Sequence, residues 1–338
     1  MAALYITSFE KGVGKTTISA GLGKHMLDDG RKVGFFKPLL SDNIEAKRED
    51  GDSDTAFMKK ILALEEPLNS LCPLIGGADN LDGKVKKAYG QISQGKDMVI
   101  AEGSCEPVLS CQQVVADLGA KVIVVAGYAE ESPGAEAIKK YQSFGKSLLG
   151  VVLNKIPRSQ LKSVRDKISA RFAEAGIKIL GILPEDRTLS ALTIGEMAEH
   201  LHGEILNSAE QSVALVENYM LGAMIVDSGL EYFGRKTNKA AVLKGDRPDM
   251  QLAALETQTS CLVLSGEEAT TDDVSYRAED RKVPIIATKE EIPAIIASIE
   301  DALGEARFHQ EKKLPRLAEL MEQHCDFTAI YQGLDLAE

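Results

Sequence analysis

The sequence has no tryptophan, few aromatic residues and no excess of positive charge. Its 338 residues include 39 Lys and Arg against 51 Asp and Glu, which gives a formal net charge of −12. A chain with this balance has no basic stripe to neutralise the phosphates of a duplex, so a nucleic-acid partner is not expected. The hydrophobic fraction of 44% is typical of a folded globular chain and excludes disorder as the main state.

Long apolar runs and cysteines with C-x-x-C spacing are also missing. No stretch approaches the roughly 18 apolar residues that a membrane helix needs, and the N-terminus does not have the pattern of a secretory signal. The five cysteines show no C-x-x-C spacing, and the five histidines follow no metal-ligand pattern. We therefore expect a cytoplasmic protein with no membrane partner, no disulfide framework and no zinc site. Cys105 and Cys111 are close in the sequence, so a redox pair is the alternative to two ordinary thiols.

The first half of the chain alternates apolar runs of four to six residues with stretches of helical periodicity. This alternation is typical of a mostly parallel sheet with helices on both faces, and it predicts an α/β fold. The expected strands are residues 4–8, 32–36, 98–102, 121–126, 149–154 and 178–183. The expected helices include residues 16–27, 54–64, 135–144 and 161–175.

The pattern restarts near residue 184, where we place a domain boundary. The first domain would cover residues 1–184, and a second, smaller α/β domain would cover residues 185–304. Residues 305–338 would form a C-terminal helix and tail, too short for a further catalytic domain. In the second domain we expect strands at 240–243, 261–264 and 283–287 and helices at 193–200, 250–256 and 292–303.

The strongest chemical signal is a glycine-containing loop between the first strand and the first helix, Leu4-Tyr-Ile-Thr-Ser-Phe-Glu-Lys-Gly-Val-Gly-Lys-Thr-Thr17. This is the context of a P-loop, whose backbone N–H groups cradle phosphates at the positive end of a helix. Lys15 would neutralise the β and γ phosphates, and the Thr16 hydroxyl would coordinate Mg²⁺. Phe9 replaces the first glycine of the motif, so an accidental Gly-Lys-Thr is the alternative. The expected nucleotide-binding residues in this loop are Glu10, Lys11, Gly12, Val13, Gly14, Lys15, Thr16 and Thr17.

A metal ion at a P-loop also needs acidic ligands, commonly at the carboxyl end of a neighbouring strand. The apolar run Met98-Val-Ile-Ala-Glu102 ends on a carboxylate, and Gly103 lets the chain turn closely beside a ligand. Glu102 is therefore a predicted Mg²⁺ ligand, although a charged residue that simply leaves the sheet is the alternative. Asp52 and Asp54 begin a helix, where either carboxylate could cap the helix or reach the metal.

Several motifs together resemble a known family. The P-loop, Phe36-Lys37-Pro38, Ser53-Asp54, Glu102-Gly103 and Val151-Val-Leu-Asn154-Lys155 have the order and approximate spacing of dethiobiotin synthetase and of the related domain at the N-terminus of long-form phosphate acetyltransferases. The match covers roughly residues 1–184.

This resemblance implies ATP and Mg²⁺ as cofactors. It implies that Thr16, Asp54 and Glu102 surround Mg²⁺, and that Lys15 and Lys37 are catalytic residues that meet phosphate and a carbamate intermediate. It also implies that Asn154 lies where adenine is recognised.

The second half resembles the domain named after its Asp-Arg-Thr-Gly-Gly motif, the DRTGG domain. Here the motif reads Asp186-Arg-Thr-Leu-Ser190, so both glycines are replaced. The segments Gly222-Ala-Met224 and Gly245-Asp-Arg-Pro-Asp249 resemble that domain more closely. Asp246 and Arg247 could bind a polar ligand or pair with each other.

A P-loop domain followed by this second domain is the arrangement that precedes the catalytic domain of long-form phosphate acetyltransferases. No acetyltransferase domain follows residue 304, so acetyltransferase activity is not expected. We expect an Mg-ATP-binding regulatory or sensor protein that forms a homodimer. A separate acetyltransferase subunit is a candidate partner, on the arrangement of domains alone.

The alternative function is an ATP-dependent ligase of the dethiobiotin synthetase or cobyrinic acid a,c-diamide synthase type. Lys37 would then orient a carboxylate or carbamate during phosphoryl transfer. The sequence Ser104-Cys-Glu-Pro-Val108 adds an acid and a rigid proline where a diamino acid substrate would need room, and no glutaminase-like segment supplies ammonia. A third alternative is a structural protein whose P-loop, with Phe9, is a relic.

Overall fold

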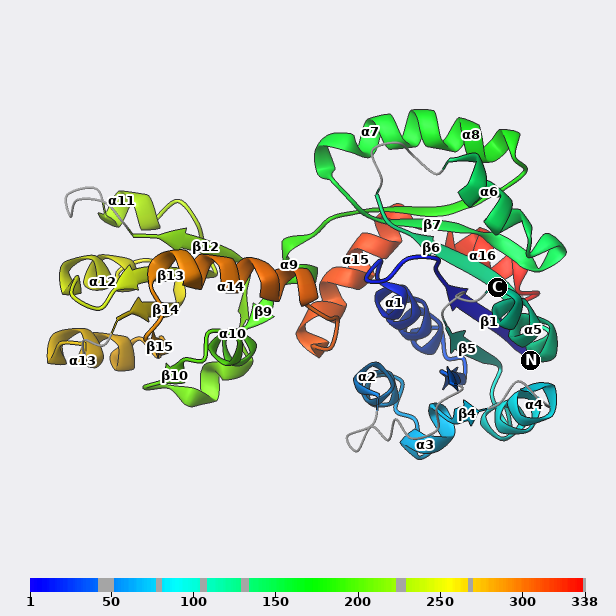
Figure 1. Cartoon of the computed structure of the whole chain (residues 1–338), viewed down its shortest axis with the longest axis horizontal. Coiled ribbons are helices and arrows are strands. Elements are labelled where there is room, and N and C mark those ends of the chain that lie inside the picture. The colour runs from blue at the N-terminus through cyan, green and yellow to red at the C-terminus, as the bar shows by residue number, and fades with distance from the viewer. Residues whose placement is uncertain are drawn as a thin grey trace. The chain divides into compact units, whose positions relative to one another are not determined.

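The computed structural model describes residues 1–41, 52–76, 81–103, 108–128, 134–222, 229–266 and 270–336 (Figure 1). The chain divides into two compact units. The first combines Met1–Glu185 with Phe308–Glu338, and the second is Asp186–Arg307. The first unit is therefore discontinuous in sequence, because the second is inserted between its two stretches.

A six-stranded parallel sheet forms the core of the first unit, in the order β2-β5-β1-β6-β7-β8. The strands are β1 (Ala2–Thr7), β2 (Val33–Phe36), β5 (Met98–Glu102), β6 (Lys121–Ala126), β7 (Leu148–Ile156) and β8 (Ile179–Pro184). Nearly all residues of β2, β5 and β6 are buried, as expected for parallel strands with apolar faces on both sides. The predicted α/β fold with a mostly parallel sheet is confirmed.

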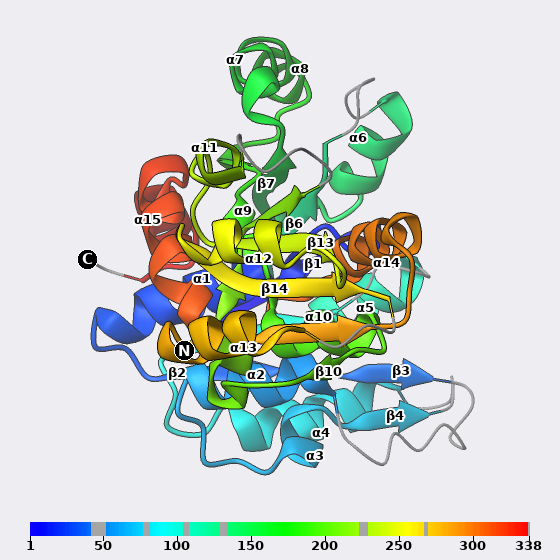
Figure 2. The ribbon, with the colours of Figure 1, turned by 90° about the vertical axis from the view of Figure 1, so that its left-hand side faces the viewer.

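The helices of the first unit follow the strands as the sequence pattern predicts. They are α1 (Lys15–Asp28), α2 (Ser53–Ile61), α3 (Leu68–Leu71), α4 (Leu81–Ile92), α5 (Val108–Leu118) and α6 (Ala135–Gln142). The single helix expected at 161–175 is instead α7 (Leu161–Ser163), a π-helical turn (Val164–Ile168) and α8 (Ser169–Glu174). A small parallel ribbon of β3 (Leu39–Ser41) and β4 (Leu74–Gly76), visible in Figure 2, was not expected.

The C-terminal stretch returns to the first unit as two helices, α15 (Leu314–His324) and α16 (Phe327–Gly333). One face of α15 is apolar and buried, with Leu317, Leu320 and Met321 at 2% exposure or less. α15 approaches α1 closely at Gly21, where a Cβ atom would lie 2.0 Å from the Met321 sulfur. The helix α15 thus contributes to the packing around α1.

The second unit is a smaller α/β fold with a five-stranded sheet in the order β10-β15-β14-β13-β12. All neighbours are parallel except β10 and β15. The strands are β10 (Glu204–Ile205), β12 (Asn218–Leu221), β13 (Lys239–Lys244), β14 (Thr259–Ser265) and β15 (Ile285–Thr288), and a short ribbon joins β9 (Leu192–Thr193) to β11 (Leu215–Val216). The helices are α9 (Arg187–Ser190), α10 (Ile194–His200), α11 (Gly229–Phe233), α12 (Pro248–Leu255), α13 (Asp272–Asp280) and α14 (Ile292–Glu305).

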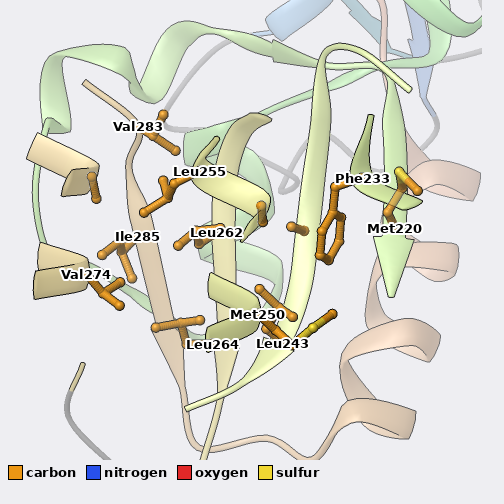
Figure 3. Close-up of a cluster of buried hydrophobic side chains, with 13 residues drawn as sticks. Met220, Phe233, Leu243, Met250, Leu255, Leu262, Leu264, Val274, Val283 and Ile285 are labelled. Carbon is orange, nitrogen blue, oxygen red and sulfur yellow. The ribbon is translucent and has the colours of Figure 1, made fainter. Parts of the chain in front are cut away.

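Apolar side chains fill both faces of this second sheet. On one face, Phe233 of α11 and Met250 of α12 pack on Leu243 and Leu262 of the strands (Figure 3). On the other face, α10 and α14 cover a separate cluster that includes Ile286. The second unit therefore has a core of its own. Within the described parts of both units, no helix is long and apolar enough to cross a membrane.

Candidate functional site

The site expected from the sequence lies at the carboxyl end of β1. This strand has β5 on one side and β6 on the other. The chain continues from β1 toward β2 on the side of β5, and from β5 to β6 on the opposite side, so the strand order reverses at β1. Crevices that bind ligands in open α/β sheets form outside the carboxyl ends of strands at such a switch point. The loop between β1 and α1 fills that position.

The loop has the backbone conformation that its glycines allow. Gly12 and Gly14 have φ angles of +72° and +92°, a left-handed region that residues with a Cβ rarely adopt. A Cβ atom at Gly14 would also lie 2.4 Å from the Asn154 side-chain nitrogen. The Phe9 ring packs against Tyr141 and Phe144, with centroids 5.7 and 6.3 Å away. The departure from the motif at this position is thus accommodated by an aromatic cluster beside the loop.

Lys15 is the first residue of α1, and its ammonium group folds back over the loop. Its Nζ atom donates to the Ser8 hydroxyl at 3.0 Å, and that hydroxyl donates to the Glu10 carbonyl at 2.6 Å. Partial burial lowers the pKa of Lys15, and the nearby Glu102 carboxylate opposes this shift. The amine is therefore held beside the loop at the positive end of a helix.

The remaining loop positions expected to meet the nucleotide are placed together with Lys15. Glu10, Lys11 and Gly12 are exposed at the tip of the loop, whereas Val13 and Thr17 are buried beneath it.

Glu102 ends β5 and is almost completely buried, with 1% of its surface exposed. One carboxylate oxygen accepts a hydrogen bond from the Thr16 hydroxyl at 2.9 Å, and the other accepts from the Ser19 hydroxyl at 3.1 Å. Burial raises the pKa of Glu102, and the positive charge of Lys37 counteracts that shift only in part. The sheet and the P-loop helix are joined through this carboxylate.

Lys37 follows β2 and lies among three carboxylates. Its Nζ atom donates to Asp52 at 3.0 Å and to Asp54 at 2.6 Å, and lies 3.9 Å from Glu102. Burial alone would lower the pKa of Lys37, but these carboxylates outweigh it and raise the pKa. Asp52 also accepts from the Thr55 backbone at 2.8 Å and so caps α2. Of the two roles considered for Asp52, capping is therefore present, in addition to the ion pair with Lys37.

Asp54 has a second partner that the sequence did not indicate. Its Oδ1 atom lies 2.9 Å from His309 Nε2, while its Oδ2 atom accepts from Lys37. Burial would raise the pKa of Asp54, but the hydrogen bond with His309 and the Lys37 charge hold it well below its usual range. No local signal marks His309, because it lies far from Asp54 in the sequence and belongs to no motif.

Asn154, near the end of β7, supports the loop from the opposite side. Its side-chain nitrogen donates to the Val13 carbonyl at 2.9 Å, and the Lys155 ammonium donates to the Gly12 carbonyl at 2.8 Å. These contacts position the P-loop. Recognition of adenine by Asn154 stays a prediction. Lys155 belongs to the same sequence motif as Asn154, but no role was predicted for it.

The oxygen donors of this site fit Mg²⁺. Thr16, Glu102 and Asp54 are linked through the Thr16–Glu102 hydrogen bond and the shared Lys37 cation, and all three offer the hard oxygen atoms that Mg²⁺ prefers. No cluster of three or more His, Cys, Asp or Glu side chains suited to a metal occurs among the described residues. A Mg²⁺ ion that is held by one or two carboxylates and by phosphate oxygens does not need such a cluster.

In the second unit, the segment that resembles the Asp-Arg-Thr-Gly-Gly motif makes internal contacts. Asp186 caps α9, Arg187 donates to Asn218 at 2.7 Å, and Thr188 donates to Glu217 at 3.1 Å. The motif therefore fixes the start of this unit against the chain that leads into β12.

The loop after β13 contains an ion pair that the sequence did not indicate. Arg247 pairs with Asp249 at 2.9 Å, and the nearby Asp246 carboxylate also raises the pKa of Arg247. The neighbouring segment that begins at Gly222 continues into 223 and 224, which lie outside the described residues, as do residues 104–107.

Two protein-family models match the chain. One describes an AAA domain and matches residues 2–193, and the other describes a DRTGG domain and matches residues 196–302. The chain belongs to this AAA-domain family. The AAA-domain match includes the P-loop and the carboxylates around Lys37, and the resemblance given under sequence analysis is confirmed.

The curated relatives fall into the two groups that the resemblance named. Phosphate acetyltransferase of Nitratidesulfovibrio vulgaris is 23% identical, and the alignment covers 97% of this chain and 51% of that protein. The chain thus spans about half the length of the phosphate acetyltransferases that it matches. ATP-dependent dethiobiotin synthetase BioD of Bacillus subtilis is 26% identical, over 61% of this chain and 97% of the relative.

Similar solved structures include MinD of Aquifex aeolicus, at 18% identity and a TM-score of 0.37, covering 56% of this chain and 84% of that one. The CBS and DRTGG domains from the regulatory region of Clostridium perfringens pyrophosphatase match at 15% identity and a TM-score of 0.32, covering 46% of this chain and 75% of that one. At these TM-scores, the matches carry no argument about function.

Proposed function

We propose that this protein binds Mg-ATP and acts as a regulatory or sensor protein. The observation that carries the proposal is the convergence of the P-loop with Thr16, Glu102, Lys37 and Asp54 at the carboxyl edge of one sheet. The AAA-domain match over residues 2–193 supports nucleotide binding by the same region.

Each residue has a defined part in the proposal. The backbone of residues 10–14 would cradle the phosphates, and Lys15 would neutralise the β and γ phosphates. Thr16, Glu102 and Asp54 would hold Mg²⁺, which supplies positive charge to the phosphates when bound. Lys37 is then a second cation at the same edge, and it neutralises the carboxylates when nucleotide is absent.

The test is calorimetric titration of the whole chain with ATP, with and without Mg²⁺, followed by measurement of phosphate release on the same sample. Binding that requires Mg²⁺ and proceeds with negligible turnover is the expected result for a sensor. Absence of binding would contradict the proposal and would favour a relic P-loop. Appreciable phosphate release would favour the second candidate function.

The second candidate is an ATP-dependent ligase of the dethiobiotin synthetase or cobyrinic acid a,c-diamide synthase type. Two observations favour it, namely the match over 97% of the length of BioD and the position of Lys37 beside the P-loop carboxylates. In a ligase, Lys37 would orient a carboxylate or carbamate toward the γ phosphate. Phosphate release that increases when a small diamine or dicarboxylate is added with ATP would establish this function. Release that no added substrate changes would contradict it.

The proposal extends to assembly. We expect a homodimer and, because one phosphate acetyltransferase aligns with 97% of this chain, a separate acetyltransferase subunit as a candidate partner. Light scattering over a range of protein concentrations tests the homodimer. A monomeric mass at every concentration would contradict it.

A further inference from the structure

A short segment that directly follows the second unit makes three contacts with α2. This return segment, residues 308–311, begins the second stretch of the first unit, immediately after Arg307 ends the second. The Phe308 ring packs edge-on against Phe57, with centroids 5.6 Å apart. Glu311 forms an ion pair with Lys60, and His309 bonds to Asp54.

The three partners on α2 lie on one face of the helix. Asp54, Phe57 and Lys60 are spaced three residues apart, and residues with this spacing are neighbours on a helix surface. The return segment therefore lies along this face of α2, and His309 reaches its N-terminal end, where Asp54 faces Lys37. Phe308 is 7% exposed, so an apolar contact anchors the segment beside His309.

His309 fixes the orientation of the Asp54 carboxylate. One oxygen of Asp54 is engaged by His309 at 2.9 Å and the other by Lys37 at 2.6 Å, so the carboxylate is held at both ends. If a ligand draws the Asp54 carboxylate away from Lys37, the hydrogen bond between Asp54 and His309 must also change. Groups that hold a metal-ligating carboxylate in this way tune the affinity of the site without touching the metal.

We propose that His309 positions Asp54 for the Mg-nucleotide site, so that the return segment leading out of the second unit is a regulatory element of that site. This inference rests on the proposed function. Coupling between sites is reciprocal, so the segment changes the affinity for Mg-ATP to the same extent that Mg-ATP stabilises the segment.

The experiment uses the full chain with His309→Ala, His309→Gln and Lys60→Ala, and titrates each with ATP in Mg²⁺ and in a metal chelator. His309→Ala is expected to weaken binding in Mg²⁺ by about tenfold and to leave metal-free binding nearly unchanged. His309→Gln places an amide near the position of Nε2 and should restore most of the affinity. Lys60→Ala removes the exposed ion pair between α2 and Glu311 of the same segment. This variant should bind Mg-ATP as tightly as the unchanged chain does.

A double-mutant cycle distinguishes positioning from a merely structural role. If His309 acts through Asp54, His309→Ala should add no further loss of Mg²⁺-dependent binding to Asp54→Ala. Hydrogen exchange of residues 305–313 should slow when Mg-ATP is added to the unchanged chain. Equal losses with and without Mg²⁺, additive losses in the cycle, or an unaffected His309→Ala variant would overturn this inference alone. Absence of ATP binding by the unchanged chain would overturn the proposed function and this inference together.

Discussion

Lys15 is the residue on which nucleotide binding depends most directly. Its ammonium group lies over the loop at the start of α1 and contacts Ser8, a neutral partner that phosphate oxygens would replace. We predict that Lys15→Ala lowers Mg-ATP affinity by about a hundredfold, the upper range for a hydrogen bond to a charged group. Titration calorimetry measures the affinity, and thermal unfolding should be unchanged.

Lys24→Ala on the same helix is the control, since Lys24 pairs only with the exposed Asp28 among the contacts described for it. Equal affinities of the two variants would refute the P-loop assignment.

Glu102 tests the metal part of the site. Glu102→Gln keeps an oxygen that can accept from Thr16 but removes the charge that would face Mg²⁺. We expect Mg²⁺-dependent ATP binding to weaken by about tenfold or more, with a smaller change in metal-free binding. Glu174→Gln, at an exposed position on α8, is the matched control. Parallel losses in the two conditions would remove Glu102 from the metal site.

The sequence predicted these residues because each one stands at a recognisable boundary. Glu102 ends an apolar strand, Asp54 begins a helix and Lys15 follows the loop glycines, and the parallel topology brings such boundaries to one edge. His309 could not be predicted, because its contact with Asp54 depends on the packing of the return segment on α2. The ion pair of Arg247 with Asp249 was not predicted either, since a local ion pair depends on the exact path of its loop.

At the scale of elements, the junction of β7 and β8 depends on a glycine. A Cβ atom at Gly150 would lie 2.5 Å from the Lys178 backbone oxygen, which cannot move without β8. We predict that Gly150→Ala lowers the free energy of unfolding by about 1–3 kcal/mol. Gly90→Ala is the matched control, because Gly90 lies on α4 and a Cβ atom added there would meet nothing within 4 Å. This variant should gain about 0.5–1 kcal/mol of stability. Urea unfolding followed by circular dichroism compares the two, and a loss of equal size in both would contradict the argument.

Strands and helices with strong periodicity were predictable, whereas short or irregular elements were not. β3 and β4 have three residues each, too few to establish a period. The π-helical turn at Val164–Ile168 interrupts a pattern that reads as one helix, because the periodicity of side chains cannot show one additional residue within a turn.

For the whole molecule, the insertion of the second unit makes a prediction about fragments. Residues 186–307 carry apolar clusters on both sides of their own sheet, so this fragment should fold alone in one cooperative transition. A chain that ends at residue 307 lacks α15 and α16, which cover α1 and β8, and its first unit should be less stable than that of the full chain. Thermal unfolding by circular dichroism measures both. An unfolded 186–307 fragment, or a shortened chain as stable as the full one, would contradict this reading of the two units.

The discontinuity of the first unit also fixes an order of events on the ribosome. The strands of the nucleotide-binding sheet are translated first, yet Gly21 on α1 and the edge of β8 stay uncovered until α15 and α16 have been made. The second unit is synthesised in between. Its core can therefore form before α15 and α16 are available to pack on the first unit. The sheet that is synthesised before the second unit therefore completes its packing only after that unit has been made, so the two units become fully packed in the reverse of the order in which their first strands are translated.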